Sequence, residues 1–302
     1  MSLEAVRHVR APAKLNLFLH VLGRRADGYH ELETAFVPID LADTLHFVRR
    51  ADARIERAGD VAGVTADDDL TVRAARLLQR ESGSRAGVTI SIDKRIPMGA
   101  GLGGGSSDAA CALLVLNRLW QLHWTCEQLA RLALQLGADV PFFVFGAPAY
   151  ARGVGERLQP LPAAARAWLP RLAVLVAPPE HVATAAVFGA AELTRDTEPI
   201  TISGLSRGWP GLPGRNDLES VVLARSPAVG HAKHALVRAM QQAGQSAEAV
   251  RMTGSGACVF AAVSEARLAE TVAANVRQAR VGDVTVVRVL PAHPLRRWAF
   301  RE

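Results

Sequence analysis

The chain has 302 residues, of which 49% are hydrophobic and 21% charged, a composition typical of a globular protein long enough to form two domains. No stretch of about 18 residues is both apolar and uncharged, and the first residues lack the apolar core of a signal peptide, so we expect a cytoplasmic protein. The net charge is +6, but the arginines are scattered and form no basic tail, which argues against nucleic-acid and membrane binding.

The first predicted element is a strand over residues 11–23, where the side chains alternate along the chain. Because alternate residues of a strand share a face, Lys14 and Asn16 should project together. A turn over residues 25–28 then precedes further strands over residues 34–39 and 43–48.

A helix is predicted over residues 69–81, after a loop-rich stretch, and a strand over residues 88–94 follows it. The next residues, 97–110 (PMGAGLGGGSSDAA), are the most informative of the chain, because five of the seven residues 99–105 are glycine. An Ala/Leu-rich helix is predicted over residues 108–122.

Strand, glycine loop and helix in this order predict a phosphate-binding site. Glycine permits a close backbone approach to a ligand, and a helix that begins at Ser106 or Ser107 points free N–H groups at an anion. The loop has neither the Gly-Lys-Ser/Thr of a Walker A motif nor the context of a dinucleotide fold; the alternative is a flexible linker. The residues expected to bind the nucleotide are Pro97, Met98, Gly99, Ala100, Gly101, Leu102, Gly103, Gly104, Gly105, Ser106 and Ser107.

A second helix is predicted over residues 125–136, and Gly137 ends it with Asp139 in the following turn. The Pro- and Ala-rich residues 160–170 indicate a boundary. Beyond it a β-α-α-β-β-α-β series predicts an α+β sandwich with helices on one sheet face. Its strands are expected at residues 172–177, 249–252, 257–263 and 284–290. Its helices are expected at residues 217–225 and 228–243, with a third that follows the third strand and ends at about residue 278.

Lysine and cysteine are both rare in this chain, which limits the residues that could act as a compact cation or as a thiol. Among the 35 basic residues of the chain only three are lysine: Lys14, Lys94 and Lys233. The compact ammonium of lysine is not interchangeable with the guanidinium of arginine at a binding site, so each of these lysines is either retained for a function or present by chance. The cysteines have no CxxC spacing and are expected to be free thiols: Cys111, Cys126 and Cys258.

Three separated segments resemble, in order and spacing, the three motifs of the GHMP kinases: residues 12–17 (PAKLNL), 97–110 and 253–258 (TGSGAC). The resemblance covers nearly the whole chain. It implies an α+β fold with an N-terminal ATP-binding domain of mixed sheet and helices, residues 1–158, and a C-terminal ferredoxin-like α/β sandwich, residues 159–302. Whether residues 291–302 return to the first domain is left open.

Residues 25–30 (RADGYH) and 136–141 (LGADVP) narrow the resemblance to those members that phosphorylate the 2-hydroxyl of a cytidine diphosphate-linked methylerythritol in the non-mevalonate isoprenoid pathway. This resemblance implies ATP and Mg²⁺ as cofactors, with the metal ligands unknown. It also implies a small-molecule substrate and a monomer or homodimer, without nucleic-acid or membrane partners.

The resemblance also assigns catalytic roles. Asp139 is expected to take the proton from the acceptor hydroxyl, while Lys14 holds the acid and the hydroxyl in place. Phosphoryl transfer needs mainly positioning and charge stabilisation, so an acid, an ammonium and a backbone cradle can suffice. The alternatives are an acid in a helix-terminal turn and a solvated strand lysine.

Four residues are expected to bind the substrate. Tyr29 would stack on the pyrimidine, His30 would hydrogen-bond to its edge, and Asn16 would bind the substrate beside Lys14. Phe188 would cover the other face of the base, although a lone Phe is more often part of a core. One departure from the family is Ala100, which stands where many members carry glycine and needs either ordinary dihedrals or a small strain.

Two other functions remain as alternatives at this stage. One is another GHMP small-molecule kinase, acting on homoserine, mevalonate or a sugar, against which the Tyr29-His30 pair argues. The other is a non-catalytic nucleotide or nucleic-acid binder that uses the positive charge, for which salt-sensitive oligonucleotide binding is expected.

Overall fold

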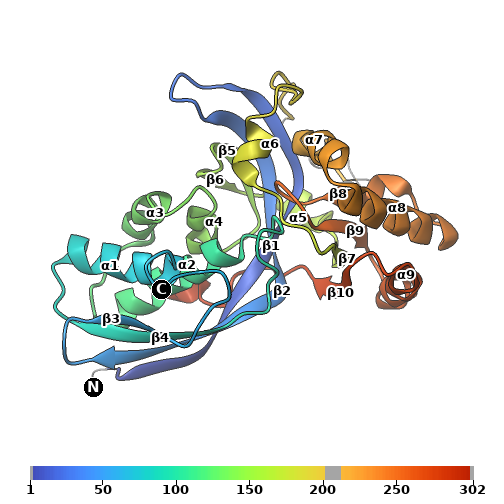
Figure 1. The fold of residues 1–302 in the computed structure, drawn as a ribbon. Helices are drawn as coiled ribbons and strands as arrows, with labels where there is room; N and C mark the ends of the chain where they lie inside the picture. Colours follow the sequence, from blue (N-terminus) through green and yellow to red (C-terminus); the bar gives the residue numbers. More distant parts are fainter. Residues whose placement is uncertain (1–2, 201–211, 300–302) are drawn as a thin grey trace.

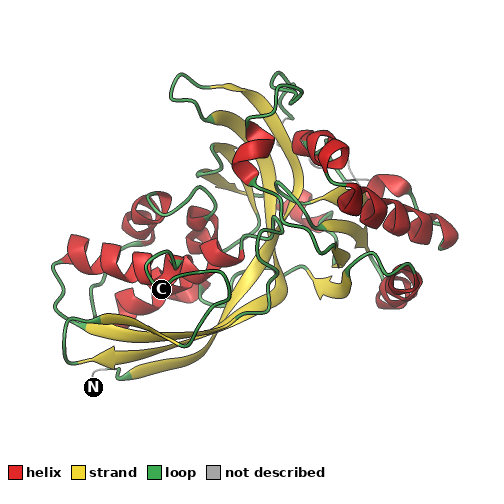
Figure 2. Ribbon diagram, in the orientation of Figure 1, coloured by secondary structure: helices red, strands yellow, loops and turns green. Residues whose placement is uncertain are grey.

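The computed structural model describes residues 3–200 and 212–299, which form two β-sheets with helices packed on them (Figures 1 and 2). The first sheet has six strands in the order β3-β4-β2-β5-β6, with β1 paired to β2. Its strands are β1 (Ala5–Arg24), β2 (His30–Arg50), β3 (Ile55–Ala58), β4 (Gly87–Asp93), β5 (Ala149–Gly153) and β6 (Arg157–Pro160).

The longest elements are β1 and β2, which pair along their length as an antiparallel hairpin that reaches past the other strands of the first sheet toward α6 (Thr184–Phe188) and α7 (Asp217–Arg225) (Figure 1). Residues 34–39 and 43–48 are strand as predicted, but they belong to one element, because β2 continues through Asp40 and Asp43. Asp43 is a fully buried acid that pairs with Lys94. The polar residues there satisfy partners within the fold, which local sequence does not reveal.

Helices cover one face of the first sheet: α1 (Leu70–Ser82), α2 (Gly104–Leu119), α3 (Cys126–Leu134) and α4 (Val140–Phe145). The core between them contains side chains of α2 such as Leu113, which pack with Phe47 and Ile90 of the sheet. Helix α1 begins where it was predicted, since Asp69 caps it by accepting the N–H of Thr71 at 2.8 Å.

The second sheet has the strand order β10-β7-β9-β8, with every neighbouring pair antiparallel. Numbered within this part, that order is 4-1-3-2, so the ferredoxin-like prediction is confirmed. The helices lie on one face of this sheet (Figure 1). The elements are β7 (Leu172–Ala177), α7 (Asp217–Arg225), α8 (Pro227–Gln242), β8 (Val250–Met252), β9 (Val259–Val263), α9 (Ala266–Gln278) and β10 (Asp283–Arg288).

Several short elements were not predicted. Besides β3, β5, β6 and α4, they are α5 (Ala163–Ala167), α6 (Thr184–Phe188), a 3₁₀ turn η2 (Ala247–Ala249) and α10 (Arg296–Ala299). Each has at most six residues, so its local pattern is weak and its pairing or packing decides its conformation.

The predicted helix over residues 125–136 ends early, at Leu134, because the chain turns through Gln135 toward Asp139.

The C-terminal residues lie against the first sheet's helices. The N–H of His293 donates to the carbonyl of Gly146 at 2.9 Å, and α10 packs on α2 and α4. The last residues of the predicted tail, 300–302, lie outside the described part of the chain. No helix among the described residues is long and apolar enough to cross a membrane.

Candidate active site

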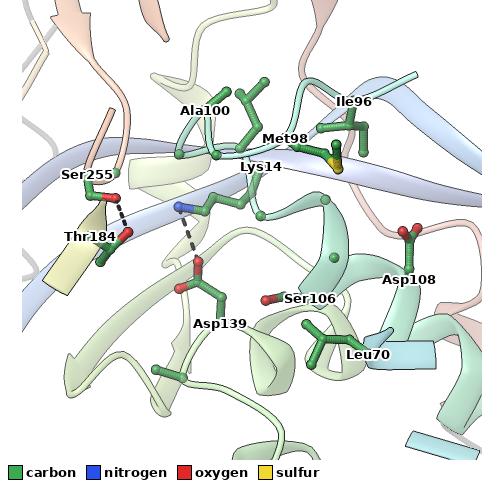
Figure 3. A pocket seen from close by; sticks show the side chains of 18 of the residues that line it. Lys14, Leu70, Ile96, Met98, Ala100, Ser106, Asp108, Asp139, Thr184 and Ser255 are labelled. Carbon is green, nitrogen blue, oxygen red and sulfur yellow. Dashed lines mark hydrogen bonds and ion pairs between the residues drawn. The ribbon is translucent and has the colours of Figure 1, made fainter. Parts of the chain in front are cut away.

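The three motifs converge on one cavity of about 590 Å³ (Figure 3). Lys14 and Asn16 reach it from β1, the glycine loop forms one wall, and Gly254 and Ser255 close it from the second sheet. The contacts between motifs are direct, because the N–H of Asn16 donates to Thr253 Oγ1 at 2.9 Å. Segments far apart in the chain therefore build a single site.

The glycine loop uses the backbone freedom that its composition implies. Gly99, Gly101 and Gly103 all have positive φ, at 65°, 72° and 71°. A Cβ on Gly101 would lie 2.2 Å from the carbonyl oxygen of Thr253, so glycine is required there by both dihedral and space. Ala100 is not among the positive-φ residues, so its methyl group is compatible with ordinary dihedrals and the loop carries no strain at this position.

Helix α2 begins at Gly104, two residues before Ser106, the earlier of the two predicted starts, with Gly103 at the N-cap. The first hydrogen bond within the helix runs from Ser107 N–H to Gly103 carbonyl at 2.9 Å. The N–H groups of Gly104, Gly105 and Ser106 therefore have no partner in the helix and face the end where its dipole is positive. Starting the helix inside the glycine run places more of these donors at the cavity.

Lys14 is the buried cation of the site, with 3% of its surface exposed. The strand register is irregular between Pro12 and Lys14, and there the Lys14 N–H donates to the carbonyl of Leu102 in the glycine loop at 3.0 Å. Its ammonium lies 3.5 Å from Asp139 Oδ2 and donates to Asn16 Oδ1 at 2.5 Å (Figure 3). The predicted acid and ammonium are therefore brought together.

Asp139 occupies the N-cap position of α4 but makes no side-chain cap hydrogen bond. Its carboxylate is 35% exposed and points into the cavity toward Lys14 (Figure 3). An N-cap acid usually binds its own helix, so a cap that instead faces an ammonium is available for chemistry.

Asn16 is a positioning group for this pair as well as a cavity residue. Its amide N–H donates to Thr34 Oγ1 at 2.9 Å, while its oxygen accepts from Lys14. Thr34 in turn donates to the carbonyl of Phe18. Both ends of the Asn16 side chain are thus engaged in holding Lys14, in addition to lining the cavity.

Sequence reasoning missed a buried ionic network under the glycine loop. Asp43 accepts the backbone N–H groups of Arg95 and Ile96 at 2.5 and 2.8 Å on one oxygen and the Lys94 ammonium on the other. Lys94 also donates to Asp108 at 2.8 Å. The rarity of lysine singled out Lys94, but no local signal identified its partners.

The protonation of this network follows from burial and charge. Burial alone lowers the pKa of Lys94, but Asp108 and Asp43 outweigh it and the net pKa is raised. Burial raises the pKa of Asp108 to about 7 in spite of Lys94, and its Oδ1 is buried without a partner among the described residues. The network therefore anchors the start of the glycine loop and the first turns of α2. Its charge depends on pH, because Asp108 changes between its neutral and charged forms.

The expected pyrimidine residues are only partly assembled. The rings of His30 and Phe188 lie 5.1 Å apart at 30°, and Phe188 lines the cavity. Tyr29 precedes them but is 64% exposed, and no ring contact with either is found among the described residues. The structure thus joins His30 to Phe188, from β2 and α6, and leaves Tyr29 at the surface.

The residues that line the cavity fit a nucleoside triphosphate. Free N–H groups and a glycine cradle suit its phosphates, and the far end of the cavity has apolar side chains suited to a base: Val61, Val64, Leu70, Ile92 and Ile96. No group of three or more metal-binding side chains occurs among the described residues. That does not exclude Mg²⁺, which usually binds nucleotide phosphates and only one or two protein oxygens.

Comparisons with known proteins show the family of the chain. A model described as GHMP kinases N terminal domain matches residues 69–147, and one described as GHMP kinases C terminal matches residues 227–281. The chain is 54% identical over 285 residues to a 4-diphosphocytidyl-2-C-methyl-D-erythritol kinase of Thiobacillus denitrificans, covering 94% of this chain and 96% of that protein. It is 51% identical over 288 residues to a protein of the same name from Aromatoleum aromaticum, covering 95% of each.

A solved structure of a 4-(cytidine 5'-diphospho)-2C-methyl-D-erythritol kinase is similar with a TM-score of 0.73 and 37% identity, covering 92% of this chain and 97% of that one. Homoserine kinase from Cytophaga hutchinsonii has a TM-score of 0.69 over 97% of this chain and 96% of that one, but only 16% identity. The second likeness shows a shared fold alone.

Proposed function

The chain belongs to the GHMP kinases, and within them to the 4-diphosphocytidyl-2-C-methyl-D-erythritol kinases, and from this we propose that Asp139 and Lys14 carry out its phosphoryl transfer. The 4-diphosphocytidyl-2-C-methyl-D-erythritol kinases are ATP-dependent phosphotransferases of the non-mevalonate isoprenoid pathway. The observation that carries the proposed roles is the 3.5 Å approach of Lys14 Nζ to Asp139 Oδ2 inside the cavity.

The acceptor hydroxyl, position 2 of the methylerythritol, would bind next to Asp139. The carboxylate takes the hydroxyl proton as the new P–O bond forms and the bond from the γ-phosphorus to the leaving ADP breaks, and Lys14 keeps that carboxylate oriented. The same ammonium offsets negative charge that accumulates on the transferred group. Asn16 and Phe36 restrain Lys14, the former by its hydrogen bond and the latter by a ring centroid 5.3 Å from the ammonium.

The glycine loop is the proposed seat of the ATP phosphates. The free N–H groups of the first turn of α2 supply donors there, and Gly101 lets the loop pack on Thr253 without a side chain between them. Mg²⁺ bound to those phosphates would neutralise part of their charge. The Ser106 hydroxyl, which lies at the cavity, is the protein oxygen proposed to hold it (Figure 3).

The cytidine of the substrate would bind at the other end of the cavity, beside Phe188 and His30. Phe188 offers a ring face and His30 a ring nitrogen, the two groups that recognise a flat heterocycle by stacking and by its edge. Tyr29 is proposed to close over the base from the surface. A monomeric or homodimeric assembly and a cytoplasmic location also remain proposals.

Substituting Asp139→Asn tests the catalytic role. Turnover of the cytidine diphosphate-linked methylerythritol with ATP and Mg²⁺ is expected to fall by about 10²- to 10⁴-fold, the usual contribution of a general base, while ATP binding is retained. Asp67→Asn is a matched control, since that carboxylate is 80% exposed and pairs with Arg76. Equal turnover in the wild type and Asp139→Asn would remove Asp139 from the mechanism.

The alternative functions have little support. A kinase for homoserine or mevalonate is favoured only by similarities near 15% identity, which concern the fold. A nucleic-acid binder would leave the pairing of buried Lys14 with Asp139 without a purpose, and competition by oligonucleotides at low salt would test it.

A further inference from the structure

The guanidinium of Arg195 holds the loop that follows α6 against β2. Its Nη2 donates to the carbonyls of Phe188 and Ala190 at 3.1 and 2.6 Å, and its Nη1 donates to the carbonyl of Leu193 at 3.0 Å. The third nitrogen, Nε, donates to His30 Nε2 at 3.1 Å. One side chain therefore ties His30 to the backbone of Phe188, the residue whose ring lies next to the imidazole and lines the cavity.

The bond to His30 decides where the imidazole carries its proton. A guanidinium has five N–H donors, no acceptor, and stays protonated in proteins, so His30 Nε2 must be the acceptor. A neutral imidazole that accepts at Nε2 carries its hydrogen at Nδ1. Burial and the charges of Arg195 and Arg24 lower the pKa of His30, which keeps the ring neutral. Among the described residues no hydrogen-bond partner is found for His30 Nδ1, so the fold itself does not use this N–H.

We propose that Arg195 is a positioning residue that holds His30 as the Nδ1–H tautomer, so that the site selects cytosine over uracil. The inference rests on the proposed binding of the cytidine beside Phe188 and His30. Ring position 3 of cytosine is a hydrogen-bond acceptor, whereas position 3 of uracil carries an N–H donor. A fixed Nδ1–H donor matches the first and opposes the second.

The first test is the wild-type protein itself, studied by ¹⁵N NMR of the histidine ring nitrogens. The expected spectrum of His30 shows a protonated Nδ1 and an unprotonated Nε2. In Arg195→Met, which has no donor, the ring is expected to redistribute toward the Nε2–H form. A wild-type ring protonated at Nε2 overturns the proposal, and this result needs no variant to fold.

The second test compares the wild type with Arg195→Met using cytidine- and uridine-diphosphate-linked methylerythritol. The ratio of the two kcat/KM values should fall by about tenfold in the variant, the value of one hydrogen bond, while kcat at saturating cytidine substrate changes little. A purely structural role of Arg195 would lower both kcat/KM values equally and leave their ratio unchanged, which would also overturn the proposal.

Two further variants separate this inference from the function on which it rests. Arg195→Lys keeps a positive donor without an acceptor and is expected to retain the Nδ1–H tautomer and most of the preference for cytosine. His30→Ala should raise KM for the cytidine substrate. If His30→Ala leaves KM unchanged, cytidine binding at this end fails, although the NMR result for Arg195 and His30 still stands.

Discussion

The ammonium of Lys14, on β1, lies 3.5 Å from the carboxylate of Asp139, at the start of α4. Lys14 is almost fully buried, whereas the Asp139 side chain is 35% exposed to the cavity. The pair therefore has a fixed, desolvated cation on one side and an accessible base on the other. Since Asn16 and the backbone of Leu102 hold Lys14 independently of Asp139, the cation stays in place when the acid moves toward a substrate.

If the two groups act as one unit, their substitutions will not be additive. Lys14→Met alone is expected to reduce kcat by at least about 10²-fold, because Asp139 loses its orienting charge. Adding Asp139→Asn to Lys14→Met should then cost far less than Asp139→Asn costs in the wild type.

A double-mutant cycle of kcat on these variants measures that coupling. Lys233→Met is the matched control, since Lys233 pairs with Glu219 in the second half of the chain. Fully multiplicative effects of the two substitutions would show that Lys14 and Asp139 act separately.

The glycine loop makes a contrasting prediction at neighbouring positions. Gly101→Ala places a Cβ 2.2 Å from the Thr253 carbonyl at a φ of 72°, so both contact and dihedral oppose it. We expect a loss of stability of about 1–3 kcal/mol and weaker ATP binding. Ala100→Gly, where no positive φ is needed, should change the free energy of unfolding by less than about 1 kcal/mol.

Urea unfolding and ATP titration of the two variants measure the difference. Gly101→Ala and Ala100→Gly with equal stability and equal ATP affinity would contradict the close packing of the loop on Thr253.

Phe188 should contribute to substrate affinity rather than to turnover. Replacing its ring in Phe188→Leu removes the stacking surface beside His30, and base stacking is worth about 1–3 kcal/mol, so KM for the cytidine substrate should rise by about 5- to 150-fold. The KM for ATP and kcat are expected to stay close to wild type. Steady-state kinetics with each substrate varied in turn distinguishes a role in substrate binding from a role in packing. A packing role would lower the stability of the protein and leave the ratio of the KM for the cytidine substrate to the KM for ATP unchanged.

Asp108 makes stability depend on pH. Burial raises its pKa to about 7 in the folded protein, above its usual value of 3.8, so the folded state binds the proton more tightly. The resulting stabilisation is complete below about pH 4 and is lost as the pH rises through about 7. Asp108→Asn lacks this titration but keeps a neutral side chain next to Lys94.

The measurement is the free energy of unfolding of both proteins at several pH values between about 4 and 8. Relative to Asp108→Asn, the wild type should become less stable with rising pH, by on the order of a few kcal/mol. Parallel curves for the two proteins would show that Asp108 has the same pKa folded and unfolded. Other buried acids, such as Glu33, are present in both proteins and cancel in the comparison.

Much of the second half of the molecule is encoded locally. The predicted strand over residues 172–177 and helix over residues 217–225 agree with β7 and α7, because their apolar patterns and flanking caps are strong. The phosphate loop is equally local, since glycines at positive φ and a following helix are properties of adjacent residues. The motifs around Lys14, Gly101 and Thr253 are therefore identifiable in the amino-acid sequence alone.

Other features depend on residues that only folding brings together. Asp43 was predicted only as the first residue of a strand, yet it is a buried anchor because Lys94 and two backbone N–H groups reach it. The proton position on His30 depends on Arg195, from a distant loop. A side chain's burial, charge state and tautomer are set by its neighbours in space, and neither spacing nor periodicity records them. The chain's motifs thus identify which groups take part, whereas packing sets the distances and protonation states with which they act.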